Sequence, residues 1–133
     1  MTIKQISVFL ENKSGRLNEV ARVLAANQIN MVAFCIAETT DFGLMRLIVQ
    51  EVDKAVDVLR NAGFAVILTD VIAIHCPNQP GALSKILESL AEEHIFIEYM
   101  YAFAQSERAD VIINPNDLGR CIQVLQEKHP DIL

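Results

Sequence analysis

The feature that most constrains this 133-residue chain is an internal repeat with a period of 66 residues. When the sequence is shifted by 66, Ile6 falls on Ile72, Val8 on Ile74, Asn12 on Asn78, Gly15 on Gly81 and Leu17 on Leu83, with no gaps. A fixed period that runs through a whole chain is typical of tandem copies of one structural unit. We therefore predict two tandem domains, residues 1–69 and 70–133, with no linker between them.

Each copy contains two amphipathic helix patterns, in which apolar residues recur three and four positions apart. The first pattern comprises Leu17, Val20, Ala21 and Leu24, repeated by Leu83, Ile86, Leu87 and Leu90. The second comprises Val52, Ala55, Val56 and Leu59, repeated by Leu118, Cys121, Ile122 and Leu125. Two helix faces that repeat in one register support the duplication independently of the turn residues.

Strand-like runs lie between these helices, at residues 6–10, 29–37, 44–49 and 64–68 in the first copy. Residues 39–43 are expected to form a turn, Gly63 to end the second helix, and Asn116 with Asp117 to begin the last one. The predicted order, βαββαβ, is that of an α+β ferredoxin-like unit. The second copy nearly lacks its last strand, because only residues 131–133 follow Pro130, so that edge of its sheet should be short or completed by a neighbour.

The second strand of each copy, residues 29–37 and 95–103, is apolar on both of its faces. A four-stranded sheet with helices on one side leaves its other face uncovered. We therefore expect the two copies to pack as an intramolecular pseudo-dimer, and two chains to form a homodimer.

Composition excludes several classes of function. The net charge of −6 and the isoelectric point near 4.9 argue against nucleic-acid and anionic-membrane partners, which need basic surfaces. The N-terminal residues lack the pattern of a secretory signal, and no apolar run is long enough to span a bilayer. Three widely spaced cysteines, without a C-x-x-C pair, predict buried thiols in a reducing compartment, so we expect a cytoplasmic protein without a metal site.

Two glycine-containing turns, "ENKSGRL" (11–17) and "PNQPGAL" (77–83), each join a strand to a helix. Asn12 or Ser14, and Asn78 or Gln79, are expected to cap those helices, with Pro80 at a first helical position. Gly15 and Gly81 lack a Cβ where a ligand could approach the backbone. A helix N-terminus carries free N–H groups and a partial positive charge, which suit a small carboxylate. The same residues also occur in β-α turns without any ligand.

The two turns, together with "INM" at 29–31 and "IFI" at 95–97, resemble the ACT domain family. The resemblance rests on an Asp/Asn-x-Pro-Gly-x-Leu turn and the entry to the second strand, and it covers essentially the whole chain. It implies a non-catalytic regulatory module that binds a free amino acid at an interface between two ACT units, needs no cofactor, and controls an enzyme in trans.

The residues that the resemblance assigns to ligand binding lie in the two turns and at the start of the second strand. They are Asn12, Lys13, Ser14, Gly15, Arg16 and Leu17 in the first turn, Asn78, Gln79, Pro80, Gly81, Ala82 and Leu83 in the second, and Asn30 with Met31 in the strand. The first turn departs from the family pattern at Ser14, where Pro is usual, and at Arg16. The counterpart of Asn30 in the second copy is Phe96.

This asymmetry suggests that the second turn faces Asn30 in the more complete polar site, whereas the first faces Phe96. An alternative pairing joins equivalent units of two chains and uses Asn12 with Asn30. The sequence carries no nucleophile elbow, phosphate loop, acid/base pair or metal-ligand cluster, so we expect no enzymatic activity. The alternative function is a protein-interaction module that binds no small molecule.

Overall fold

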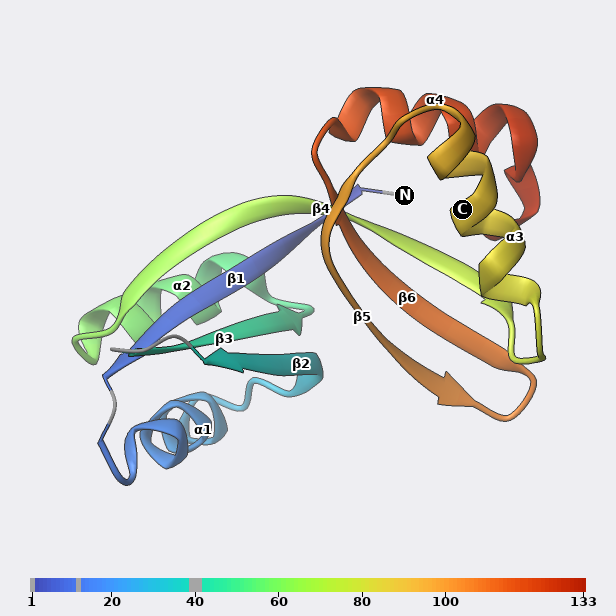
Figure 1. The fold of residues 1–133 in the computed structure, drawn as a ribbon. Coiled ribbons are helices and arrows are strands. Elements are labelled where there is room, and N and C mark those ends of the chain that lie inside the picture. Colours follow the sequence, from blue (N-terminus) through green and yellow to red (C-terminus); the bar gives the residue numbers. More distant parts are fainter. Residues whose placement is uncertain (1, 12, 39–41) are drawn as a thin grey trace. The chain divides into compact units, whose positions relative to one another are not determined.

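The computed structural model describes residues 2–11, 13–38 and 42–133, and Figure 1 shows its ribbon. The strands are β1 (Thr2–Glu11), β2 (Met31–Glu38), β3 (Phe42–Val49), β4 (Ala65–Pro77), β5 (Ile97–Gln105) and β6 (Arg108–Pro115). The helices are α1 (Arg16–Ala26), α2 (Val52–Asn61), α3 (Ala82–Glu92) and α4 (Leu118–Lys128), followed by a short 3₁₀ helix, η1 (Pro130–Ile132). The predicted βαββαβ order is confirmed in the first copy, and the two ferredoxin-like units are confirmed.

The chain forms two compact units. One comprises Lys4–Thr69, and the other comprises Asp70 to the C-terminus together with the first residues of the chain. The long strand β4 supplies the last strand of one unit and the first strand of the next. In the first unit β3 pairs antiparallel with both β1 and β2, and in the second β6 pairs antiparallel with both β4 and β5.

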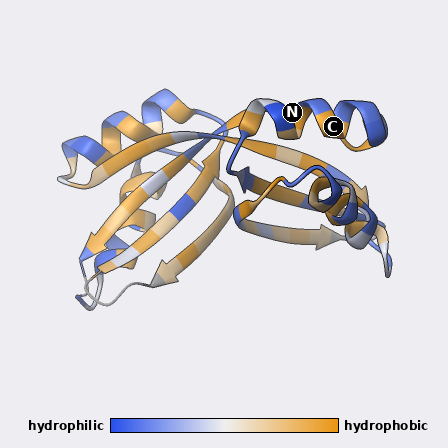
Figure 2. Ribbon diagram, turned by 45° about the horizontal axis from the view of Figure 1, so that its top comes forward, coloured by the Kyte–Doolittle hydropathy of each residue, from blue (hydrophilic) through white to orange (hydrophobic). Residues whose placement is uncertain are grey.

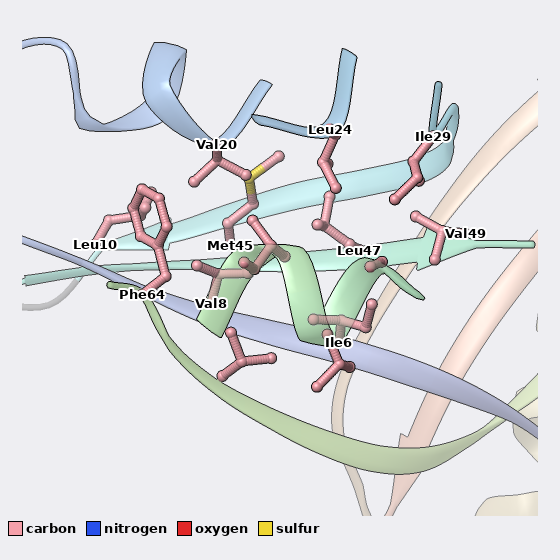
Figure 3. Packing of buried hydrophobic residues seen from close by; sticks show 14 residues of the cluster. Ile6, Val8, Leu10, Val20, Leu24, Ile29, Met45, Leu47, Val49 and Phe64 are labelled. Carbon is pink, nitrogen blue, oxygen red and sulfur yellow. The ribbon is translucent and has the colours of Figure 1, made fainter. Parts of the chain in front are cut away.

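The core of the first unit lies between its sheet and its two helices (Figure 3). It contains Val20 and Leu24 from α1 and three residues of α2, all packed against alternate residues of β1 and β3. The expected face of α1 is confirmed for Val20 and Leu24, but Leu17, in the first turn of that helix, is 42% exposed. The pattern of hydropathy along the ribbon agrees: strands are mostly hydrophobic and helices alternate (Figure 2).

The second unit repeats this core with Ile86 and Leu90 from α3, against Ile72 and Ile74 of β4. It also buries Cys121 of α4, whose pKa rises to about 11 because burial disfavours the thiolate and Asp117 adds negative charge. The thiol therefore packs as a small hydrophobic group.

Among the described residues the second copy has no last strand, as the sequence indicated, and η1 follows α4 instead. Residues 2 and 3, at the start of β1, belong to this second unit, and β1 is hydrogen-bonded to β4. The beginning of the same chain therefore joins the unit that lacks a fourth strand.

The turn predicted at 39–43 is wrong at its end, because Phe42 and Gly43 already belong to β3; residues 39–41 lie outside the described residues.

β2 stands at one end of the strand order. Three of its apolar side chains, Val32, Phe34 and Ile36, are about half exposed, at 45%, 54% and 46%. Gly63 adopts the expected left-handed conformation after α2, with φ of 91°.

Candidate functional site

The two repeated turns adopt the same backbone conformation. Gly15 and Gly81 stand at the N-caps of α1 and α3 with φ values of 89° and 85°, and neither helix receives a side-chain cap. The prediction that Ser14, Asn78 or Gln79 caps these helices is therefore wrong, because the glycine occupies the cap position. Pro80 precedes that cap and is not a helical residue. A Cβ on either glycine would meet nothing within 4 Å, so the left-handed conformation, and not lack of space, requires glycine here.

The second turn is tied to the hairpin that joins β5 and β6. The backbone N–H of Asn78 donates to the carbonyl of Glu107 at 2.8 Å, and its Nδ2 donates to the carbonyl of Ser106 at 2.9 Å. The side chain of Asn78 thus has a structural role in this conformation. Gln79 and Pro80 are exposed.

Charged residues dominate the first turn. The carboxylate of Glu11 lies 3.0 Å from Nζ of Lys13 and 3.9 Å from Nη2 of Arg16. The hydrogen bond from Lys13, its charge and that of Arg16 lower the pKa of Glu11, so this carboxylate is ionised at neutral pH. Ser14 is exposed, and the predicted ligand residue Asn12 lies outside the described residues.

Arg16 is the most closely held charged residue of this turn. Its guanidinium carbon lies 4.6 Å from the centre of the Phe64 ring, and its Nη1 donates to Oε2 of Glu19 at 2.7 Å. The side chain is 22% exposed. Its Nε is buried and has no hydrogen-bond partner among the described residues. Arg16 therefore covers the end of the core while keeping part of its hydrogen-bonding capacity unused.

A pocket of about 280 Å³ opens beside Arg16. Strand β1 contributes Phe9, Leu10 and Glu11 to its wall, and Phe42, Gly63 and Ala65 complete it. The rings of Phe9 and Phe42 lie 5.8 Å apart, centre to centre. The pocket thus combines an apolar wall with one cation and one anion.

Asn30 lies in a different pocket of the same unit, of about 250 Å³, lined by Gln28, Ile29, Asn30, Gln50 and Glu51. This pocket shares no lining residue with the one beside Arg16. Met31 packs against the core. The predicted pairing of Asn30 with the second turn stays a prediction.

A polar cluster on β4 and β6 was not predicted from the sequence. His75 Nδ1 hydrogen-bonds to Oδ1 of Asp110, and Arg108 Nε donates to the same oxygen at 2.9 Å. Nη2 of Arg108 also lies 3.4 Å from Nε2 of His75. His75 and Asp110 are direct cross-strand partners, so only the strand register could have revealed the cluster.

Comparison with known proteins places this geometry in a family. A family model described as an ACT domain pair matches residues 1–132. The crystal structure of protein BT0572 from Bacteroides thetaiotaomicron is 55% identical, with a TM-score of 0.95 over 100% of this chain and 92% of that one. No curated protein matches the chain.

The fold also occurs in the regulatory subunit of aspartate kinase from Thermus thermophilus, at 16% identity and a TM-score of 0.69, over 97% of this chain and 95% of that one. None of the helices in the described ranges is long and apolar enough to cross a membrane. The matched model, the two repeated units and the paired glycine turns lead to one conclusion: this chain belongs to the ACT domain pair family.

Proposed function

We propose that this protein is a non-catalytic sensor that binds a free amino acid near its strand-to-helix turns and regulates a partner enzyme in trans. The observation that carries the proposal is the turn conformation that recurs in both units of an ACT domain pair, with a left-handed glycine at each helix N-terminus. Free N–H groups at such a terminus favour a carboxylate. The regulatory subunit of aspartate kinase, which has the same fold, is consistent with this role.

The candidate ligand residues remain those of the two turns and the start of β2. Binding at a boundary between units would couple ligand to their relative placement, which is how a module without an active site can transmit a signal. The separate pockets at Arg16 and at Asn30 offer two places in the first unit where a small molecule could make polar contacts.

A thermal-shift screen of the full chain against the twenty amino acids tests the proposal. A ligand at a hundred times its Kd should stabilise the fold by about 2.7 kcal/mol, so one amino acid, or a few of related chemistry, should raise the Tm clearly. If no amino acid moves the Tm, the sensor function is wrong.

A second candidate function, a protein-interaction module, is favoured by the apolar edge strand. Val32, Phe34 and Ile36 expose apolar side chains on β2, which stands at the end of the strand order. An exposed apolar edge is a site at which another chain can add a strand. The predicted homodimer would use such an edge. Light scattering after size-exclusion chromatography measures the oligomeric state of the wild type and of Phe34→Ser.

A further inference from the structure

The charges at the first turn are arranged around one small pocket. Arg16 and Glu11 both line it, and the nearest nitrogen and oxygen of the two side chains are 3.9 Å apart. This separation exceeds hydrogen-bond distance. Lys13 contacts Oε2 of Glu11 at 3.0 Å, so Oε1 of Glu11 and Nη2 of Arg16 are the atoms that retain capacity for a further partner. A site that presents a cation and an anion side by side is complementary to a molecule that carries both charges.

The position of Arg16 is fixed before any ligand arrives. The Phe64 ring supports one face of the guanidinium, and Glu19 holds Nη1. Phe64 is a 5% exposed core residue, at the same end of the core as Leu10 (Figure 3). Nη2 makes no hydrogen bond to a described residue, whereas Nε is buried and also has no partner among them. Nη2 is therefore the nitrogen from which the guanidinium can donate a charge-assisted hydrogen bond to a carboxylate.

The remaining wall of the pocket is apolar. Phe9 and Phe42 contact each other through their rings, and Leu10 and Ala65 lie beside them. The volume of about 280 Å³ is near the lower limit of about 300 Å³ for small-molecule sites, which suits a ligand of amino-acid size. An apolar side chain would be desolvated against this wall, whereas a charged one would find no second counter-charge there.

We propose that this pocket binds a free amino acid with an apolar or aromatic side chain as its zwitterion. The ligand carboxylate pairs with the guanidinium of Arg16, its ammonium group pairs with Glu11, and its side chain contacts Phe9 and Phe42. This inference rests on the proposed sensor function and gives it a location and a ligand class.

The second unit cannot form the same site. At an offset of 66 residues, Glu11, Arg16, Phe9 and Phe42 are replaced by Pro77, Ala82, His75 and Arg108. The paired charges and both aromatic rings are lost together. Each chain should therefore hold one such site, at the first turn, although the sequence alone favoured the second.

The test begins with the thermal-shift screen and continues with isothermal titration of the amino acid that gives the largest shift. Arg16→Gln should weaken its affinity at least about tenfold, or 1.4 kcal/mol. Arg120→Gln is the matched control. Arg120 lies on α4 of the other unit and also donates to a glutamate, Glu93, at 2.7 Å. The affinity of this variant for the amino acid should stay within about twofold of the wild-type affinity.

Two analogues of the same amino acid assign the two charges. The primary amide lacks the carboxylate, so its affinity should not respond to Arg16→Gln. The carboxylic acid without the amino group should not respond to Glu11→Gln, whereas the parent amino acid should lose affinity in both variants. Glu11 is exposed, so Glu11→Gln should fold normally and decides the test even if Arg16→Gln, which uncovers Phe64, does not fold.

The possible failures are distinguishable. An amino acid that binds the wild type, and binds Arg16→Gln and Glu11→Gln equally well, overturns this pocket and leaves the sensor function standing. Loss of binding in Asn78→Ala, without loss in those two variants, would show that the ligand binds at the second turn and would also overturn the inference. If no amino acid binds the wild type, the proposed function and this inference both fall.

Discussion

At the scale of single residues, glycine at positions 15 and 81 could be singled out from the sequence, but its reason could not. We expected it to make room for a ligand, whereas the structure shows that each glycine is the helix N-cap and has a left-handed conformation. The surrounding Asn, Ser and Pro residues suggested caps because those residue types favour them. In the structure the glycine occupies the cap position instead, because the backbone there is left-handed. The surrounding residue types do not by themselves specify that conformation.

This reason predicts opposite effects for two alanine substitutions. Gly81→Ala should lower the free energy of unfolding by about 1 kcal/mol, because a Cβ is unfavourable in the left-handed region. Gly119→Ala should raise it by about 0.5–1 kcal/mol, because Gly119 lies within α4 and alanine restricts the unfolded chain. The added Cβ would lie 4.0 Å from Oδ1 of Asp117, an ordinary contact. Urea denaturation measures the free energy of unfolding of both variants. A change of the same sign in the two would contradict the explanation.

At the scale of elements, helix periodicity and strand order could be predicted well. The duplicated stripes located all four helices, and Asp117 begins α4 as expected, accepting a hydrogen bond from the N–H of Arg120 at 3.0 Å. Contacts between strands could not be predicted, because they depend on register. The cluster of His75, Asp110 and Arg108 is an example, since His75 is more than thirty residues away from both of its partners in the sequence.

That cluster predicts a dependence of stability on pH. Burial alone would raise the pKa of Asp110, but hydrogen bonds from His75 and Arg108 and the charges of these side chains lower it below its ordinary value of 3.8. The folded protein thus binds fewer protons at this site than the unfolded chain. The resulting stabilisation is present above the ordinary pKa of Asp and is lost as the pH falls through the lower, folded value.

Asp110→Asn should therefore lower the free energy of unfolding by about 1 kcal/mol at pH 7. The difference from the wild type should shrink as the pH falls below about 4. Chemical denaturation at several pH values measures it, with Asp57→Asn on the exposed side of α2 as the control. A difference that stays constant from pH 7 to pH 2 would show that the ionised carboxylate does not stabilise this cluster.

At the scale of the whole molecule, the duplication and the fold could be predicted because period and binary pattern act along the entire chain. The membership of residues 2 and 3 in the second unit could not be predicted. These residues precede the predicted first strand, and nothing local indicates that their contacts lie with residues about seventy positions away. The missing last strand did indicate that this edge of the sheet would be short or would involve a neighbour.

A variant lacking Thr2 and Ile3 tests this arrangement. Its second unit should lose about 1–2 kcal/mol, because the adjacent part of β4 loses hydrogen-bond partners. Hydrogen–deuterium exchange should become faster in Val71–Ala73, while the β2–β3 hairpin of the other unit stays protected. Thr2→Ala keeps the backbone and should change little. Equal deprotection of both units would contradict a local role for the N-terminus.

The shared start of β1 also has a consequence for synthesis of the protein. Residues 2 and 3 are synthesised before the first unit, yet the strand that they accompany, in the unit that begins at Asp70, emerges only after that whole unit has been made. Domains usually fold one after another from the N-terminus during translation. Here the first unit can fold before residues 2 and 3 meet their partners in the second unit, and an extension fused before Thr2 would therefore affect the second unit and not the first.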